Sequence, residues 1–214
     1  MLSRSGRPFA QVVFGPFARA AVKLRISANT ATFVGGLATC ASAIGFFTTN
    51  HLVWGIVVTS LLAVFDNLDG QIARMTGTVS QWGAFLDSTM DRLADGAIFG
   101  SLAMWAYLHA DSATQAWGLS GALVAGLVGA IVPYARARAQ AIGKDAAVGL
   151  AERADRLVAA GIILILTVVF GHWVFAVGMW LIACASLLTV AQRMAFVRRQ
   201  IMADESVSEN RVKR

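Results

Sequence analysis

The sequence predicts an all-α integral membrane protein, with six transmembrane helices and an N-terminal amphipathic helix that lies in the membrane interface. Hydrophobic residues make up 57% of the 214 positions and charged residues only 14%, which is too apolar for a soluble domain of this length. Apolar runs long enough to cross about 30 Å of hydrocarbon as helices recur between short polar segments. The runs are continuous rather than alternating, which favours helices over the strands of a barrel.

The first predicted element, residues 8–25, is the interfacial helix. Basic residues such as Arg19 and Lys23 alternate here with apolar residues such as Phe9 and Phe17, a pattern typical of helices that lie flat on a membrane. A plain basic tail is the alternative. A removable signal peptide is not expected, because prolines, a glycine and basic residues interrupt the segment.

Six apolar windows follow, and they cover residues 30–47, 52–73, 83–108, 117–137, 157–170 and 174–197. Lysine and arginine gather before the first window, after the second, between the fourth and fifth, and after the sixth, whereas the segments near Asn50, Asp111 and His172 have none. The positive-inside rule therefore predicts a multi-pass protein of the cell membrane with both termini and the active site on the cytoplasmic side. Residues 1–202 are expected to form one membrane domain, and residues 203–214 a polar, disordered tail.

Carboxylates within the second and third windows are the candidate functional groups, because charge inside a membrane is costly and usually serves a function. They are Asp66, Asp69, Asp87, Asp91 and Asp95. The first two are three residues apart and the next two are four apart, so each pair projects from one helix face. Four carboxylates offer oxygen ligands that suit Mg²⁺ or Mn²⁺ better than zinc, and they are enough for two ions. The alternative is that the acids form buried ion pairs with Arg74 and Arg92, or a proton relay.

Eight residues at fixed spacings resemble the signature of the CDP-alcohol phosphotransferase family. The pattern D-x-x-D-G-x-x-A-R, eight residues, then G-x-x-x-D-x-x-x-D is met by Asp66, Asp69, Gly70, Ala73, Arg74, Gly83, Asp87 and Asp91. The resemblance implies that an alcohol attacks a CDP-linked donor directly and releases CMP. It also implies that the four motif aspartates hold two Mg²⁺ ions, with Mn²⁺ as an alternative, and that Asp91 is in addition the general base.

The same resemblance implies contacts to the donor, CDP-diacylglycerol, and a homodimer. The expected donor contacts are Asn29, Thr30, Ala31, Thr32, Gly70, Ala73, Arg74 and Ser80. The sequence departs from the family just before the first window. A proline commonly stands in the middle of the pattern that here reads Ser27, Ala28, Asn29.

Arginines between the fourth and sixth windows are the candidate site for a phosphate on the acceptor, because guanidinium forks suit phosphate oxygens. They are Arg136, Arg138, Arg153, Arg156 and Arg193. The alternative is that they are positive-inside anchors, partly paired with acids. The segment E-R-A-D-R-L and the pair Gln192-Arg193 resemble actinobacterial phosphatidylinositol-phosphate synthases, which join CDP-diacylglycerol to inositol 1-phosphate. Pro133 and Arg136 stand where that subfamily commonly has serine and lysine, and glycerol 3-phosphate is the alternative acceptor.

A different class of function also fits the intramembrane acids, namely a cation- or proton-coupled carrier. The acids lie near the predicted cytoplasmic boundary, whereas carriers usually place their site at the midplane between broken helices, so the enzyme is favoured. The net charge is +6, but the basic residues are not gathered into a soluble basic domain. The expected partners are therefore membrane lipid and the two substrates, and not nucleic acid.

Overall fold

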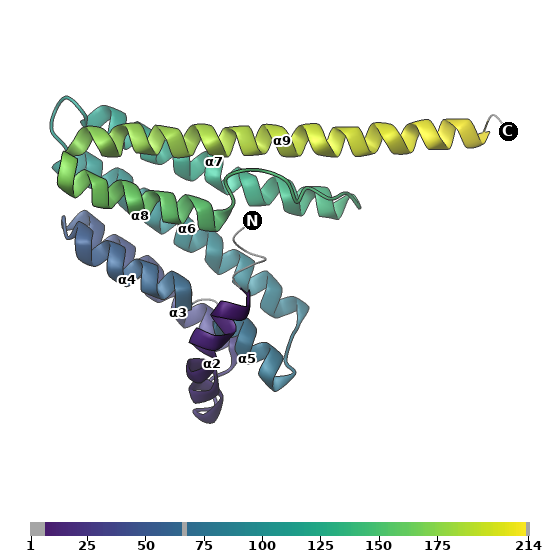
Figure 1. Ribbon diagram of the computed structural model, residues 1–214, viewed down its shortest axis with the longest axis horizontal. Helices are drawn as coiled ribbons and strands as arrows, with labels where there is room; N and C mark the ends of the chain where they lie inside the picture. The colour runs from purple at the N-terminus through teal and green to yellow at the C-terminus, as the bar shows by residue number, and fades with distance from the viewer. Residues whose placement is uncertain (1–6, 66–67, 213–214) are drawn as a thin grey trace. The chain divides into compact units, whose positions relative to one another are not determined.

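The computed structural model describes residues 7–65 and 68–212, and every regular element within them is an α-helix (Figure 1). This agrees with the all-α class that the sequence predicts. The chain forms two compact units, residues 1–101 and residues 102–214, and the division falls inside α6 (Gln81–His109). The helices before α6 therefore belong to the first unit, and those after it to the second.

The first unit contains α2 (Arg7–Lys23), α3 (Ala28–Thr48), α4 (Leu52–Phe65), α5 (Leu68–Thr76) and the beginning of α6. Ser27 starts α3 as its N-cap, because the side-chain oxygen accepts a hydrogen bond of 3.1 Å from the Thr30 amide. α3 packs against both α4 and α5, and the buried hydroxyls of Ser42 and Thr59 join α3 to α4 at 3.0 Å. α2 packs against α5.

The second unit contains the remainder of α6 together with α7 (Gln115–Ala141), α8 (Arg153–Phe170) and α9 (His172–Val212). α9 packs along α7 and α8 (Figure 1). Glycines let α7 approach α9 closely: a Cβ added at Gly118 would lie 3.1 Å from the Phe175 ring, and one at Gly121 would lie 3.1 Å from the Met179 side chain. These small residues thus serve packing within the chain.

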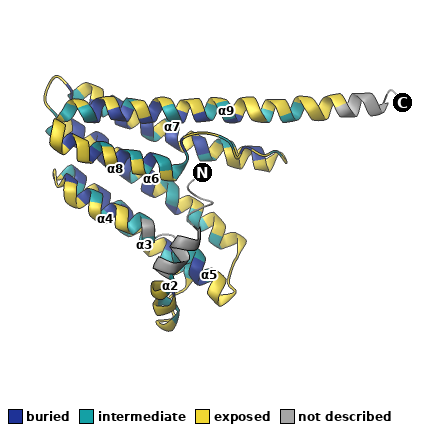
Figure 2. Cartoon of the chain, in the orientation of Figure 1, coloured by how far each residue is buried: buried dark blue, intermediate teal, exposed yellow. Residues whose placement is uncertain are grey.

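Four helical segments are long and apolar enough to cross a membrane, among the residues that the structure describes. They are Ala28–Thr48, Leu52–Thr76, Gln115–Ala141 and His172–Ser206. Large apolar side chains on them are exposed, such as Leu127 at 69% and Leu181 at 64%. Figure 2 shows exposed positions along α7 and α9. The chain is therefore a multi-pass membrane protein, in which lipid solvates these side chains.

The six-span arrangement stays a prediction, because α6 and α8 are not among these four segments. Each of the two helices carries several charged residues between its N-terminus and its middle: Asp87, Asp91, Arg92 and Asp95 in α6, and Arg153, Asp155 and Arg156 in α8. Charges at the end of a span can stay near the interface while the rest of the helix is in lipid.

The first and the last described residues belong to helices, α2 and α9. α2 occupies almost the range predicted for the interfacial helix, and its position at the interface stays a prediction. α9 continues to Val212, so helix extends into residues 203–212, where the composition predicts a disordered tail. No glycine or proline interrupts the sequence there, and residues 202–206 are all exposed (Figure 2).

Asp111 joins two loops of the second unit that are far apart in sequence. Its carboxylate accepts a hydrogen bond of 3.0 Å from the Thr114 amide and lies 3.0 Å from Nδ1 of His172. Desolvation acts to raise the pKa of Asp111, but the hydrogen bonds from Thr114 and the neighbouring His172 outweigh it and hold the pKa below the ordinary value of 3.8. A lowered carboxylate pKa adds stability at pH values above 3.8, and this stability is lost as the pH falls through the folded-state pKa.

We therefore expect Asp111→Asn to lower the melting temperature slightly at pH values above 3.8, and to make a smaller difference below it. The effect is small because the carboxylate is largely exposed. Thermal melting in detergent across a pH series measures it. Asp145→Asn is the matched control, since the Asp145 carboxylate also accepts a bond from a nearby amide, that of Ala147 at 3.0 Å. A pH-independent difference for Asp111→Asn would contradict the prediction.

Candidate functional site

A cavity of about 180 Å³ lies in the first unit, where α3, α5, the loop after α5 and the start of α6 meet. It is lined by Ala28, Asn29, Thr32, Asp69, Gly70, Ala73, Arg74, Thr78, Val79, Ser80, Gly83, Ala84 and Asp87. The structure thus brings together most of the motif and most of the residues expected to contact CDP-diacylglycerol. Two expected contacts, Thr30 and Ala31, are not among the lining residues. The Thr30 hydroxyl lies 2.8 Å from that of Ser27, in the N-cap of α3.

Two glycines of the motif leave room for polar groups in this cavity. A Cβ added at Gly70 would lie 3.3 Å from Nη1 of Arg74. One added at Gly83 would lie 3.3 Å from the Ser80 hydroxyl and 3.4 Å from Oδ1 of Asn29. The Ser80 hydroxyl also accepts a hydrogen bond of 3.0 Å from the Gly83 amide, at the start of α6. Because the two glycines have no side chain, they leave space beside the guanidinium, hydroxyl and amide groups that line the cavity.

Asp69 is held in place by hydrogen bonds from both sides. The Thr32 hydroxyl donates to Oδ2, and the Gly70 amide donates to Oδ1. Asp69 also lies in the first turn of α5, where the helix dipole stabilises a negative charge. Thr32 is 2% exposed. The structure therefore gives Thr32, predicted as a contact to the donor, a direct bond to a predicted metal ligand.

The acids of α6 follow one another along the helix. Asp87 lines the cavity. Nη2 of Arg92 lies 3.6 Å from a carboxylate oxygen of Asp91 and 3.6 Å from one of Asp95. These separations are longer than a hydrogen bond. The positive charge of Arg92 therefore lies close to both carboxylates. This is the arrangement that the ion-pair alternative predicts for this arginine.

The metal site is described in part, because Asp66 lies outside the described residues. Among the residues that are described, no three His, Cys, Asp or Glu side chains gather closely enough to hold an ion. Two of the four predicted ligands, Asp69 and Asp87, line the same cavity. Their carboxylate oxygens are the donors that a hard divalent cation prefers, so these residues fit a Mg²⁺ or Mn²⁺ ion.

The predicted acceptor-phosphate arginines lie in the second unit, and they differ in exposure. Arg136 and Arg138 are exposed near the end of α7, and Arg153 is half-buried at the start of α8. Arg156 and Arg193 are buried, at 2% and 3% exposure. Arg136 and Glu152 both lie close enough to act on the charge of Arg193, Arg136 by repulsion and Glu152 by attraction.

The two buried arginines are oriented by the backbone. Arg193 donates from Nε to the Val148 carbonyl at 2.9 Å and from Nη1 to the Val132 carbonyl at 2.5 Å. Arg156 donates from Nη1 to the Ala151 carbonyl at 3.4 Å. The guanidinium of Arg193 has five N–H groups, and its bonds to the two carbonyls set its orientation with two of them. Sequence alone does not distinguish such arginines from surface anchors.

The guanidinium of Arg156 also lies against α7. A Cβ added at Gly129 would lie 3.2 Å from Nε of Arg156. Pro133 lies inside α7 and has no amide hydrogen to donate to the Gly129 carbonyl, four residues earlier. Pro133 stands where the resembled subfamily commonly has serine. With proline at this position, α7 lacks one backbone N–H donor next to the buried Arg156.

Comparison with known proteins identifies the family. The model of the CDP-alcohol phosphatidyltransferase family matches residues 25–191. The chain belongs to this family. It is therefore a transferase enzyme, and the resemblance inferred from the motif is confirmed.

Relatives within the CDP-alcohol phosphatidyltransferase family cover nearly the whole chain. A phosphatidylinositol phosphate synthase of Corynebacterium glutamicum is 37% identical over 205 residues, which are 96% of this chain and 93% of the relative. One of Mycobacteroides abscessus is 39% identical over 203 residues, 92% of this chain and 88% of the relative. The resemblance to actinobacterial synthases is thus confirmed as well.

Solved structures of the Mycobacterium tuberculosis phosphatidylinositol phosphate synthase resemble the chain at 32% identity. One of them, with CDP-DAG bound, has a TM-score of 0.78 and covers 85% of this chain and 92% of the solved one. Another, in complex with manganese and citrate, also has a TM-score of 0.78 and covers 85% of this chain and 87% of the solved one.

Some lining residues of the cavity were not predicted from the sequence. Thr78 and Val79 lie in the loop between the two halves of the family motif, and Ala84 follows the motif glycine Gly83. Their place between fixed motif positions is the only signal that could have indicated them. Residue type could not, because a threonine, a valine and an alanine carry no distinctive chemistry.

Proposed function

We propose that this chain transfers the phosphatidyl group of CDP-diacylglycerol to a hydroxyl of inositol 1-phosphate, giving phosphatidylinositol phosphate and CMP. The observation that carries the proposal is the cavity in which Asp69, Asp87, Gly70 and Arg74 of the family motif converge. The names of the relatives support the choice of product, and the CDP-DAG in the related Mycobacterium tuberculosis structure supports the choice of donor.

The cavity residues divide into groups that bind the donor and groups that leave room for it. Arg74 supplies positive charge for the pyrophosphate, and Asn29 and Ser80 supply hydrogen-bonding groups. Gly70 and Gly83 keep the space beside these side chains open, since a Cβ at either position would crowd them. Thr32 acts indirectly, because its hydroxyl fixes the carboxylate of Asp69.

Asp69 and Asp87, together with Asp66 and Asp91, would hold the divalent cations, which we propose are two Mg²⁺ ions, with Mn²⁺ as a substitute. Bound cations neutralise the negative charge of the pyrophosphate and of the leaving CMP. The oxygen donors that line the cavity and the manganese of the related structure support this assignment.

We assign the general base to Asp91. Its carboxylate takes the proton of the acceptor hydroxyl while the hydroxyl oxygen attacks the phosphorus that bears the diacylglycerol. A new P–O bond forms on one side as the bond to CMP breaks on the other, so no covalent enzyme intermediate is needed. Nη2 of Arg92 lies 3.6 Å from a carboxylate oxygen of Asp91 and places a positive charge beside it.

The acceptor phosphate is assigned to Arg136, Arg138, Arg153, Arg156 and Arg193. Arg193 is pre-oriented, because two of its N–H groups donate to the Val148 and Val132 carbonyls and three remain for a phosphate. Glycerol 3-phosphate carries a phosphate too, so it stays the alternative acceptor. The relatives' names favour inositol phosphate.

An assay with the purified protein tests the choice of acceptor. The protein receives CDP-diacylglycerol and Mg²⁺ with inositol 1-phosphate, free inositol or glycerol 3-phosphate, and mass spectrometry identifies the lipid formed. We expect phosphatidylinositol phosphate from the first acceptor, and at least about tenfold less product from free inositol, because the arginines would then lack their phosphate partner. Phosphatidylglycerophosphate as the main product would overturn the proposed acceptor and leave the reaction class intact.

We also propose that the chain spans the cell membrane six times, with both termini and the site on the cytoplasmic side, and that it works as a homodimer. The distribution of lysine and arginine supports the orientation. The length of α6, 29 residues, and of α8, 18 residues, supports the two additional spans.

A further inference from the structure

The loop between α7 and α8 is attached to α9 through the hydroxyl of Thr189. Oγ1 of Thr189 accepts hydrogen bonds from the Leu150 amide at 3.3 Å and from the Ala151 amide at 3.0 Å. The same hydroxyl donates to the Ala185 carbonyl at 2.9 Å, so its one hydrogen and both of its lone pairs are used. Thr189 is 0% exposed. The hydroxyl is thus shielded from solvent, and its three hydrogen bonds hold it in a defined geometry.

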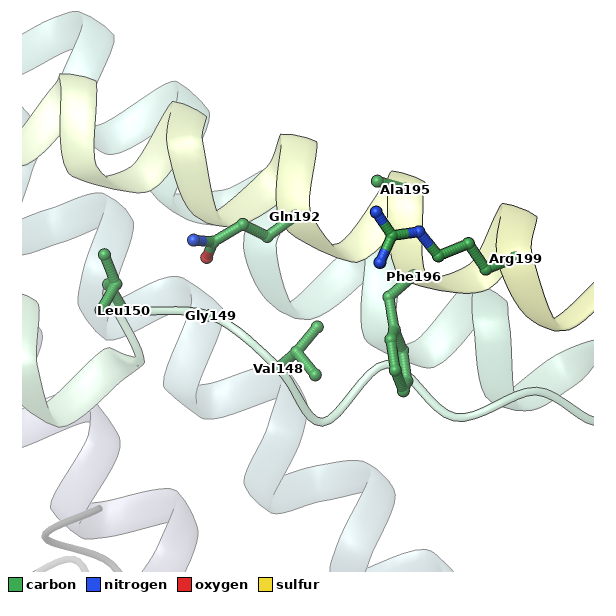
Figure 3. Close-up of a pocket in the computed structure, with 7 residues that line it drawn as sticks. All are labelled: Val148, Gly149, Leu150, Gln192, Ala195, Phe196 and Arg199. Atoms are coloured by element: carbon green, nitrogen blue, oxygen red, sulfur yellow. The ribbon is translucent and has the colours of Figure 1, made fainter.

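A second attachment lies one helical turn further along α9. Arg193 donates to the carbonyl of Val148. Residues four apart lie on the same face of a helix, so Thr189 and Arg193 hold the two ends of the segment Val148–Ala151. Figure 3 shows this segment running beside α9. A cavity of about 380 Å³ is lined by this segment and by α9, through Val148, Gly149, Leu150, Gln192, Ala195, Phe196 and Arg199.

The attached segment leads directly into α8. Glu152 is the N-cap of α8, and its amide donates to Oδ2 of Asp155 at 3.2 Å in a capping box. Arg153 is the first residue of the helix, and Arg156 lies one turn further on, with Nη1 bonded to the Ala151 carbonyl. The Thr189 hydroxyl, which binds the amides of Leu150 and Ala151, therefore also positions the start of α8. Arg153 and Arg156, the two predicted phosphate-binding arginines there, project from this position.

We propose that Thr189 is a positioning residue for the phosphorylated acceptor: its hydroxyl sets the start of α8 and thereby the guanidinium groups of Arg153 and Arg156. This inference rests on the proposed function, in which those arginines bind the acceptor phosphate. Thr189 itself does not contact a substrate. Its loss should weaken acceptor binding and leave donor binding unchanged.

The test compares Thr189→Val, which keeps the branched shape and removes the hydroxyl, with Thr189→Ser, which keeps the hydroxyl and removes the methyl group. We expect Thr189→Val to raise KM for inositol 1-phosphate about tenfold, the effect of losing a buried pair of hydrogen bonds. KM for CDP-diacylglycerol and kcat should change less than about twofold, and Thr189→Ser should restore KM to near the wild-type value.

Hydrogen exchange of the Leu150 and Ala151 amides gives a second readout that does not depend on activity. Exchange at these two amides should be faster in Thr189→Val than in the wild type and in Thr189→Ser. Thr167→Val is the control for removing a buried threonine hydroxyl, since Thr167 donates to Ile163 within its own helix at 2.7 Å and is 3% exposed. It should change neither KM nor these exchange rates.

The outcomes separate this inference from the proposed function. Unchanged KM and unchanged exchange in Thr189→Val overturn the inference, and so does a Thr189→Ser variant that behaves like Thr189→Val, because the methyl group would then be responsible. If the wild type uses glycerol 3-phosphate instead, KM for that acceptor replaces KM for inositol 1-phosphate. If the wild type uses neither, the proposed function and the acceptor role fail together, while amide exchange still decides whether the hydroxyl holds the loop.

Discussion

Asp91→Asn should lower kcat by about a thousandfold, the typical contribution of a general base together with charge at the site. Asparagine has nearly the same shape as aspartate, but its amide cannot take the proton of the acceptor hydroxyl and carries no negative charge for a cation. The measurement is CMP release at saturating CDP-diacylglycerol and inositol 1-phosphate, with Mg²⁺ present. A variant that releases CMP at the wild-type rate would exclude Asp91 as the base.

Asp95→Asn is the matched control for this substitution. Asp95 lies one turn further along α6, and its carboxylate lies at the same 3.6 Å distance from Nη2 of Arg92, but it is not part of the family motif. We expect Asp95→Asn to keep kcat within about tenfold of the wild type, since it removes charge next to Arg92 without removing the base. An equal loss of kcat in both variants would show that the interaction with Arg92 matters, rather than proton transfer.

The sequence predicted the helices well where apolar runs have clear ends. The window 83–108 corresponds to α6, Gln81–His109, and the window 117–137 lies inside α7, Gln115–Ala141. The window 52–73 corresponds to α4 and α5, and the last window continues as helix to Val212. Hydropathy marks where a helix meets lipid. It does not mark where a polar helix ends, because that depends on capping and breaking residues.

The cavity between α3, α5 and α6 could be predicted from local spacing, because Asp69, Gly70 and Arg74 share one short helix and Gly83 and Asp87 share the next. Contacts between distant residues could not be predicted in this way. Thr32 bonds to Asp69 across 37 positions, and Thr189 bonds to Ala151 across 38. A threonine inside an apolar helix has no pattern that identifies its partner, since most such hydroxyls bond to their own helix.

Gly149→Ala should have the largest effect on stability, lowering the free energy of unfolding by about 2–5 kcal/mol through backbone strain and overpacking. Gly149 has a φ of +131°, a conformation that side chains with a Cβ rarely adopt. An added Cβ would also lie far closer than 3.0 Å to Cγ2 of Thr189. Thermal or denaturant unfolding in detergent measures the loss. Gly143→Ala is the control, because Gly143 has a φ of +72° but nothing within 4 Å of an added Cβ.

A double variant separates the two causes. Serine at position 189 lacks the Cγ2 that collides with the new methyl group but keeps the hydroxyl that binds the loop, so Thr189→Ser should recover the overpacking part of the Gly149→Ala loss. The backbone strain remains in the double variant, since the loop keeps its φ. It should exceed the loss in Gly143→Ala, because a φ of +131° lies farther than +72° from the left-handed region that residues with a Cβ can adopt. Full recovery in the double variant would mean that the positive φ costs nothing there. No recovery at all would mean that the loop moves away from α9 rather than collide with Thr189, and that the loop is less firmly attached than its hydrogen bonds indicate.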